Sequence, residues 1–142
     1  MSKINSGRVL LGGIVAGIVM NVVDFIVNVP ILGAQWKVST DKLLPNPPPG
    51  LDGTSAMGWI LSDLVAGLFM IWLYAAIRPR FGPGPKTALM AGLGVWFITH
   101  LAYASLFFMG LYPAELVCAS TAGALVAFLA GGLAGGALYQ EA

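Results

Sequence analysis

Four ionisable side chains interrupt stretches of sequence that are otherwise apolar, and they are Asp24, Asp63, His100 and Glu115. A charged group inside a membrane costs about 2.5–3.5 kcal/mol on insertion scales, so each of them marks a candidate site. A carboxylate beside an imidazole could relay protons, because each group can hold or release one. The same groups could bind a hard divalent cation, and the imidazole alone could ligate a haem iron from one side. We rank the three chemistries in that order.

Further polar side chains accompany these groups at helical spacing. Asn21, Asp24 and Asn28 are separated by three and four residues, which places them on one face of a helix. Tyr103 follows His100 by three residues. If the apolar segments form a bundle, these side chains converge on one pocket, which we call the outer polar cluster. Its predicted members are Asn21, Asp24, Asn28, Asp63, His100, Tyr103 and Glu115.

Each member also has a structural explanation. Asn21 and Asp24 could fix the helix register through hydrogen bonds, and His100 could be a satisfied core side chain. Glu115 falls in the first turn of a predicted helix, where a carboxylate interacts favourably with the helix dipole. That position alone accounts for Glu115, whereas Asp24 and His100 lie deepest and are the hardest to explain in this way.

The elements that must position these groups are membrane-spanning helices. Hydrophobic residues make up 58% of the 142-residue chain and charged residues only 9%, against about 25% charged residues in a soluble domain. None of the apolar stretches shows the alternation of a β-barrel strand. We therefore predict a single all-α transmembrane domain over residues 1–142, a bundle of four helices with an outer loop at residues 33–55. The stretches that reach the roughly 20 residues needed for a span are 9–32, 56–77, 87–111 and 113–138.

Prolines and glycines predict where these helices end. Residues 78–85 read Arg-Pro-Arg-Phe-Gly-Pro-Gly-Pro, which favours a turn. Pro113 stands where the fourth helix would begin. Within the outer loop, residues 35–44 could form a short helix at the membrane surface. The first span follows a charged start like that of a signal peptide, but no small-residue cleavage site follows it, so we expect it to be retained.

Lysine and arginine residues predict the orientation, because they concentrate in cytoplasmic segments. Both termini are then cytoplasmic, and the outer polar cluster lies in the outer half of the bilayer. The N-terminal tail and the second loop together carry five basic residues, whereas the outer loop carries two. The five are Lys3, Arg8, Arg78, Arg80 and Lys86, and the two are Lys37 and Lys42.

Glycine pairs at a spacing of four residues predict close contacts between helices. Gly13 and Gly17 lie on one face of the first span. The fourth span carries two overlapping pairs, which are Gly131, Gly132, Gly135 and Gly136. Glycine lets two backbones approach, so we expect these faces to pack within the bundle. Association of the fourth helices of two chains is the alternative.

Several classes of function find no support in the sequence. Cys118 is the only cysteine, so one chain has neither an internal disulfide nor a thiolate metal cage. No phosphate-binding loop, dinucleotide fingerprint, zinc-protease motif or nucleophile elbow is present. No large basic cluster indicates nucleic acid as a partner. The sequence therefore favours a non-enzymatic protein.

Three short motifs resemble those of small bacterial four-helix membrane proteins to which no activity is assigned. The motifs are Asn21-x-x-Asp24-Phe25-x-x-Asn28, the run at residues 32–36, and the run at residues 78–84. The resemblance implies a multi-pass protein of the bacterial cytoplasmic (inner) membrane. It implies no site residues.

Our leading hypothesis is a non-enzymatic accessory or structural subunit without a predicted cofactor. Its partners would be the lipid bilayer together with further copies of the chain or other membrane proteins. The alternative is a small transporter, proton-coupled or specific for a cation, that uses the outer polar cluster. A weaker alternative is a haem-binding or redox subunit that uses His100.

Overall fold

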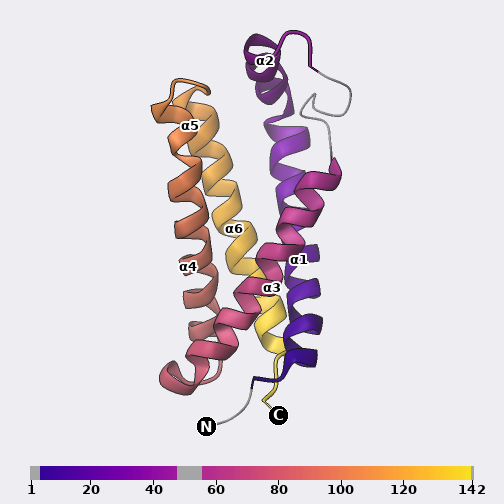
Figure 1. Ribbon diagram of the computed structural model, residues 1–142, viewed down its shortest axis with the longest axis vertical. Coiled ribbons are helices and arrows are strands. Elements are labelled where there is room, and N and C mark those ends of the chain that lie inside the picture. The colour runs from indigo at the N-terminus through magenta and orange to yellow at the C-terminus, as the bar shows by residue number, and fades with distance from the viewer. Residues whose placement is uncertain (1–3, 48–55, 142) are drawn as a thin grey trace.

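The computed structural model describes residues 4–47 and 56–141. Four long helices form a bundle, and residues 4 and 141 lie at the same end of it (Figure 1). All regular secondary structure in these two ranges is helical. The four helices are long and apolar enough to cross a membrane. The predicted all-α four-helix fold is confirmed, and the chain is a multi-pass membrane protein.

The first span combines α1 (Ser6–Ile26) with a π-helical turn, η1 (Val27–Ile31). Pro30 explains the π-helical turn, because proline lacks an N–H group and its ring crowds the preceding turn of an α-helix. The amide of Leu32 instead donates to the carbonyl of Val27, five residues earlier, at 2.9 Å. The span therefore continues past its proline instead of stopping there.

A short helix, α2 (Gly33–Leu43), follows at the end of the bundle that is remote from residues 4 and 141 (Figure 1). It coincides with the surface helix expected at residues 35–44. The ammonium of Lys37 lies 2.8 Å from the carboxylate of Asp41 one turn later. This hydrogen bond, together with the charge of Asp41, raises the pKa of Lys37 above its usual value.

The second span, α3 (Ala56–Phe81), is longer than predicted. We expected a turn over residues 78–85, but α3 passes through Pro79 and the turn is confined to residues 82–84. Gly82 and Gly84 have positive φ angles of 84° and 125°, which glycine adopts without strain. Gly82 and Gly84 reverse the direction of the chain. Pro79 therefore lies inside α3 and takes no part in the turn.

The third span, α4 (Pro85–Tyr103), is separated from the short helix α5 (Ser105–Phe108) by a break at Ala104. We predicted one continuous helix over residues 87–111. The hydroxyl of Ser105 donates to the carbonyl of Ala102 at 2.6 Å, a local bond that competes with the regular helical ladder. The chain has left the helical conformation by Gly110, whose φ is +71°.

The fourth span, α6 (Ala114–Leu138), contacts all three other spans. Pro113 is its N-cap and not its first helical residue, because its ψ of 144° is extended. α1 and α4 lie on opposite sides of α6, and α3 runs obliquely from beside α1 to beside α4 (Figure 1). α3 thus diverges from α4 as it approaches the α2 end of the molecule.

Glycines set the separations between these helices. A Cβ atom on Gly67 of α3 would lie 2.6 Å from the carbonyl oxygen of Gly13 in α1. A Cβ atom on Gly12 of α1 would lie 2.6 Å from the carbonyl oxygen of Gly135 in α6. One on Gly92 of α4 would lie 2.7 Å from the carbonyl oxygen of Phe128 in α6. Three helix pairs are therefore in backbone contact.

The fourth-span glycines divide between two neighbours. Gly131 and Gly135 face Ala16 and Gly12 of α1, whereas Gly132 and Gly136 face Ala88 of α4. All four glycines therefore pack against helices of the same chain. Small residues and methionines fill the core, with Met20, Met70 and Ile71 fully buried. Large apolar side chains cover the exterior, as a lipid environment requires.

Candidate functional site

The crossing of α1 and α3 brings Asp24 and Asp63 near each other. Gly17 makes the crossing close, since a Cβ atom there would lie 2.7 Å from the Cα atom of Leu64 and 3.0 Å from the carbonyl oxygen of Asp63. Next to it, the side-chain amide of Asn21 donates to the carbonyl of Gly17 at 2.9 Å and to that of Ile60 in α3 at 3.3 Å. Asn21 therefore connects α1 to α3 within one helical turn of each carboxylate.

Asp24 and Asp63 form what we call the carboxylate pair. Asp24 follows Asn21 by three residues in α1, and Asp63 follows Ile60, the partner of Asn21, by three residues in α3. The Oδ1 atom of Asp24 is buried without a hydrogen-bond partner among the described residues. No lysine, arginine or histidine within the described ranges lies at ion-pair distance from either carboxylate. Two negative charges near each other in a low-dielectric medium repel unless they share a proton or a cation.

A second polar group lies around Asn28, at the π-helical turn. Its side-chain amide donates to the carbonyl of Asp24 at 3.1 Å. Its Oδ1 atom accepts hydrogen bonds from the indole of Trp36 at 3.0 Å and from the hydroxyl of Ser120 at 3.1 Å. Asn28 thus connects three elements, namely η1, α2 and α6. The ring of Trp36 also meets the ring of Tyr112 edge-on, with the centroids 5.2 Å apart.

This polar group continues into α4 through Tyr103 and His100. The indole of Trp96 donates to the carbonyl of Thr121, the residue after Ser120, at 3.1 Å. The ring of His100 is 5.7 Å from that of Tyr103, stacks on Trp96 at 5.6 Å and meets Phe128 edge-on at 5.8 Å. We call the residues from Trp36 through Asn28, Ser120 and Tyr103 to His100 the polar chain.

Hydrogen bonding assigns the tautomer of His100. Its Nδ1 atom lies 3.0 Å from the carbonyl oxygen of Trp96 and 3.1 Å from the hydroxyl of Thr99. A carbonyl oxygen only accepts, so Nδ1 carries the proton in the neutral ring. The lone pair is then on Nε2, which is the atom that would accept a proton or bind a metal.

The predicted outer polar cluster is therefore divided in the structure. Asn21, Asp24 and Asp63 lie at one helix crossing, and Asn28, Tyr103 and His100 belong to the polar chain. Glu115 joins neither, because it is exposed in the first turn of α6, where the helix dipole accounts for it. Within residues 4–47 and 56–141, no three histidine, cysteine or carboxylate side chains are placed to hold a metal ion.

Sequence reasoning missed Ser120 and did not include Trp36 in the outer polar cluster. A signal for Ser120 exists in the spacing of its helix. Ser120, Ala124 and Ala127 recur at intervals of four and three residues and are all buried, so the serine lies on the packed face of α6. A buried hydroxyl on such a face needs a partner, and here the partner is Asn28.

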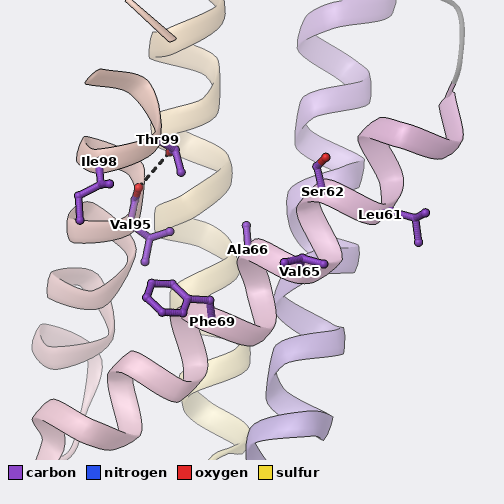
Figure 2. A pocket seen from close by; sticks show the side chains of 8 residues that line it. All are labelled: Leu61, Ser62, Val65, Ala66, Phe69, Val95, Ile98 and Thr99. Atoms are coloured by element: carbon purple, nitrogen blue, oxygen red, sulfur yellow. Dashed lines mark hydrogen bonds between the residues drawn. The ribbon is translucent and has the colours of Figure 1, made fainter. Parts of the chain in front are cut away.

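A groove opens where α3 diverges from α4 (Figure 2). Its volume is about 510 Å³, and its walls are apolar apart from two hydroxyl groups. Ser62 donates to the carbonyl of Gly58 at 2.8 Å, and Thr99 donates to the carbonyl of Val95 at 3.0 Å. Both hydroxyls are thus satisfied by their own helices. The groove is lined by Leu61, Ser62, Val65, Ala66, Phe69, Val95, Ile98 and Thr99.

Comparison of the chain with protein-family models, with curated proteins and with solved structures finds no match.

Proposed function

We propose that this protein is a non-enzymatic accessory subunit of a bacterial cytoplasmic membrane, and that it binds a transmembrane helix of a partner protein between α3 and α4. The observation that carries the proposal is the groove at that position. The pairs α1–α3, α1–α6 and α4–α6 are closed by glycine contacts, whereas α3 and α4 leave a lipid-facing space of about 510 Å³.

The lining of the groove fits an apolar helix. Ala66 lies between the larger side chains of Phe69 and Val65 (Figure 2), and its small size leaves room for a side chain of a packed helix. Because Ser62 and Thr99 already donate within their own helices, the occupant needs no matching polar group. In lipid, helix association depends on this kind of close packing, since there is no hydrophobic driving force between helices.

The test is site-specific photo-crosslinking in native membranes. A photoreactive residue at Ile98, in the groove, should give one discrete protein adduct, whereas the same residue at Val126, exposed on α6, should give none. The substitution Val65→Trp should abolish the Ile98 adduct, because Val65 is 65% exposed and its enlargement fills the groove without entering the core. Val126→Trp is the matched control, since Val126 is 58% exposed on another helix.

The adduct itself discriminates between occupants. A single partner in a fixed ratio, lost with Val65→Trp and retained with Val126→Trp, supports the proposal. An adduct of twice the subunit mass would instead identify a second copy of the chain. Lipid adducts alone would show that the groove is filled by acyl chains, and either result would refute the accessory role assigned to this surface.

The carboxylate pair supports a second candidate, a small proton-coupled or cation transporter. We propose that Asp24 and Asp63 share the proton or cation. In reconstituted vesicles, Asp24→Asn and Asp63→Asn should each abolish flux driven by a proton or cation gradient. Glu115→Gln should leave the flux unchanged, because Glu115 lies apart from the pair. Flux that persists in both aspartate variants would remove the pair from any transport mechanism.

A further inference from the structure

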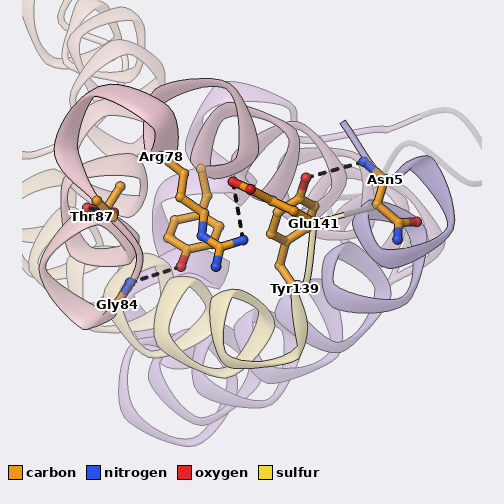
Figure 3. A network of polar contacts seen from close by, with 8 residues as sticks. Asn5, Arg78, Gly84, Thr87, Tyr139 and Glu141 are labelled. Carbon is orange, nitrogen blue, oxygen red and sulfur yellow. Dashed lines mark hydrogen bonds and ion pairs between the residues drawn. The ribbon is translucent and has the colours of Figure 1, made fainter. Parts of the chain in front are cut away.

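Arg78 is a partly buried cation with unused hydrogen-bond donors. It lies near the end of α3, where residues from both ends of the chain meet (Figure 3). Its side chain is only 18% exposed. The Nε and Nη1 atoms are buried and form no hydrogen bonds among the described residues. Leaving charged donors unsatisfied in this way costs free energy, so the site is incomplete as it stands.

Aromatic rings hold the guanidinium group in place. Its central carbon lies 5.5 Å from the centroid of the Tyr139 ring, and the ring of Tyr74 meets that of Tyr139 edge-on at 5.8 Å. The hydroxyls of both tyrosines accept backbone hydrogen bonds at 3.2 Å, from Asn5 to Tyr139 and from Gly84 to Tyr74. These hydrogen bonds fix the orientation of both rings, so the guanidinium group packs against a rigid aromatic surface.

Glu141 supplies the one carboxylate at ion-pair distance from this arginine within the described ranges. Its Oε1 atom lies 3.5 Å from Nη1, and its side chain is 37% exposed. At that separation the pair balances charge without forming a hydrogen bond. Glu141 therefore acts as a weak internal anion that a stronger one can displace.

We propose that Arg78 binds a phosphate group, and that its source is the headgroup of an anionic phospholipid. A planar guanidinium matches two phosphate oxygens through paired N–H donors, and displacement of Glu141 would free Nη1 as one of them. Arg78 lies near the end of a span, at the depth of lipid headgroups. Arg80 and Lys86 are exposed on either side of the adjoining turn and add positive charge at this end. The proposal does not depend on the function of the groove.

The experiment titrates the detergent-solubilised full chain with short-chain phosphatidylglycerol and follows bound lipid by native mass spectrometry. Arg78→Gln should weaken binding about tenfold, the loss expected for a charged hydrogen bond. Arg80→Gln removes the same charge from an exposed side chain and should change binding by less than about twofold. Phosphatidylcholine should bind more weakly than phosphatidylglycerol, because its choline cation offsets the phosphate charge.

Glu141→Gln keeps Arg78 in place and tests the competition directly. Removal of the internal anion should strengthen binding of phosphatidylglycerol severalfold, and this variant decides the matter if Arg78→Gln fails to fold. Unchanged or weaker binding by Glu141→Gln would overturn the proposal. So would equal losses from Arg78→Gln and Arg80→Gln, which would indicate unspecific surface charge. Displacement of the lipid by inorganic phosphate at equal concentration would assign the site to free phosphate and refute the lipid source.

Discussion

The glycines of this protein differ in the space available for an added Cβ atom. Some contact the backbone of a neighbouring helix, and others have open space beside them. In α3, Gly67 faces the backbone of Gly13 and Gly17, whereas no atom of the described residues lies within 4 Å of a Cβ atom added at Gly58. Both are glycines in an apolar helix, so the sequence does not separate them. Replacement by alanine should nevertheless have opposite effects on the stability of the bundle at the two positions.

Gly67→Ala should destabilise the bundle by about 1–3 kcal/mol, because the new methyl group forces α1 and α3 apart and overpacked sites carry costs of this size. Gly58→Ala in the same helix should be neutral or stabilising by up to about 1 kcal/mol, since alanine favours the helical state. Thermal unfolding in detergent, followed by circular dichroism, measures both. Equal stability of the two variants would mean that α1 and α3 are not in backbone contact.

The residues of the candidate site illustrate what could be predicted and what could not. Asp24 and His100 are conspicuous because they are ionisable groups in apolar segments, and sequence alone indicates them. Ser120 is inconspicuous, because a serine in a transmembrane helix costs little free energy. Its role depends on a hydrogen bond to Asn28, 92 residues away in the sequence. The separation of Glu115 from the other carboxylates depends on how α6 is rotated, and rotation is set by glycine contacts with two neighbours at once.

Among the elements, α2 depends on a tertiary anchor more than on its own sequence. It has eleven residues, and isolated helices of this length are marginal in water. Trp36 joins it to the bundle twice, through the hydrogen bond to Asn28 and through ring contact with Tyr112. The ion pair between Lys37 and Asp41 is exposed and adds little.

Trp36→Phe should therefore loosen α2 without disturbing the spans. Phenylalanine retains an aromatic ring against Tyr112 but lacks the indole N–H, so Asn28 loses a donor worth roughly 1 kcal/mol. Hydrogen–deuterium exchange should become about fivefold faster over residues 33–43 and remain unchanged in α6. Trp59→Phe is the control, since Trp59 is 67% exposed at the start of α3. Equal exchange in the two variants would show that the indole bond does not hold α2.

Element boundaries were less predictable than element identity for a physical reason. An apolar segment of this length forms a helix in lipid, because a span must satisfy the hydrogen bonds of all its backbone groups internally. Proline is a weaker signal in that setting, since α3 includes Pro79 and the first span includes Pro30. The chain reverses instead at Gly82 and Gly84, where positive φ angles permit the turn.

For the whole molecule, the two ends of the bundle differ in how tightly they are joined. At one end, the hydrogen bond between Asn5 and Tyr139 and the ion pair between Arg78 and Glu141 connect residues near both termini to the end of α3. Towards the opposite end, α3 diverges from α4 and leaves the groove. A partner helix in the groove and a lipid at Arg78 would thus occupy opposite parts of the molecule.

The orientation of the bundle decides which leaflet meets each of these sites. The excess of basic residues predicts that the joined end is cytoplasmic, where anionic lipids give the surface a negative potential that attracts arginine and lysine. In a Cys118→Ala background, Asn46→Cys should react with a membrane-impermeant maleimide in intact spheroplasts. Lys86→Cys should react only after permeabilisation. Both positions are exposed in the fold, so access depends on the side of the membrane alone. The reverse pattern would place Arg78 in the outer leaflet and the carboxylate pair in the cytoplasmic half, which would invert the direction of any proton or cation uptake by Asp24 and Asp63.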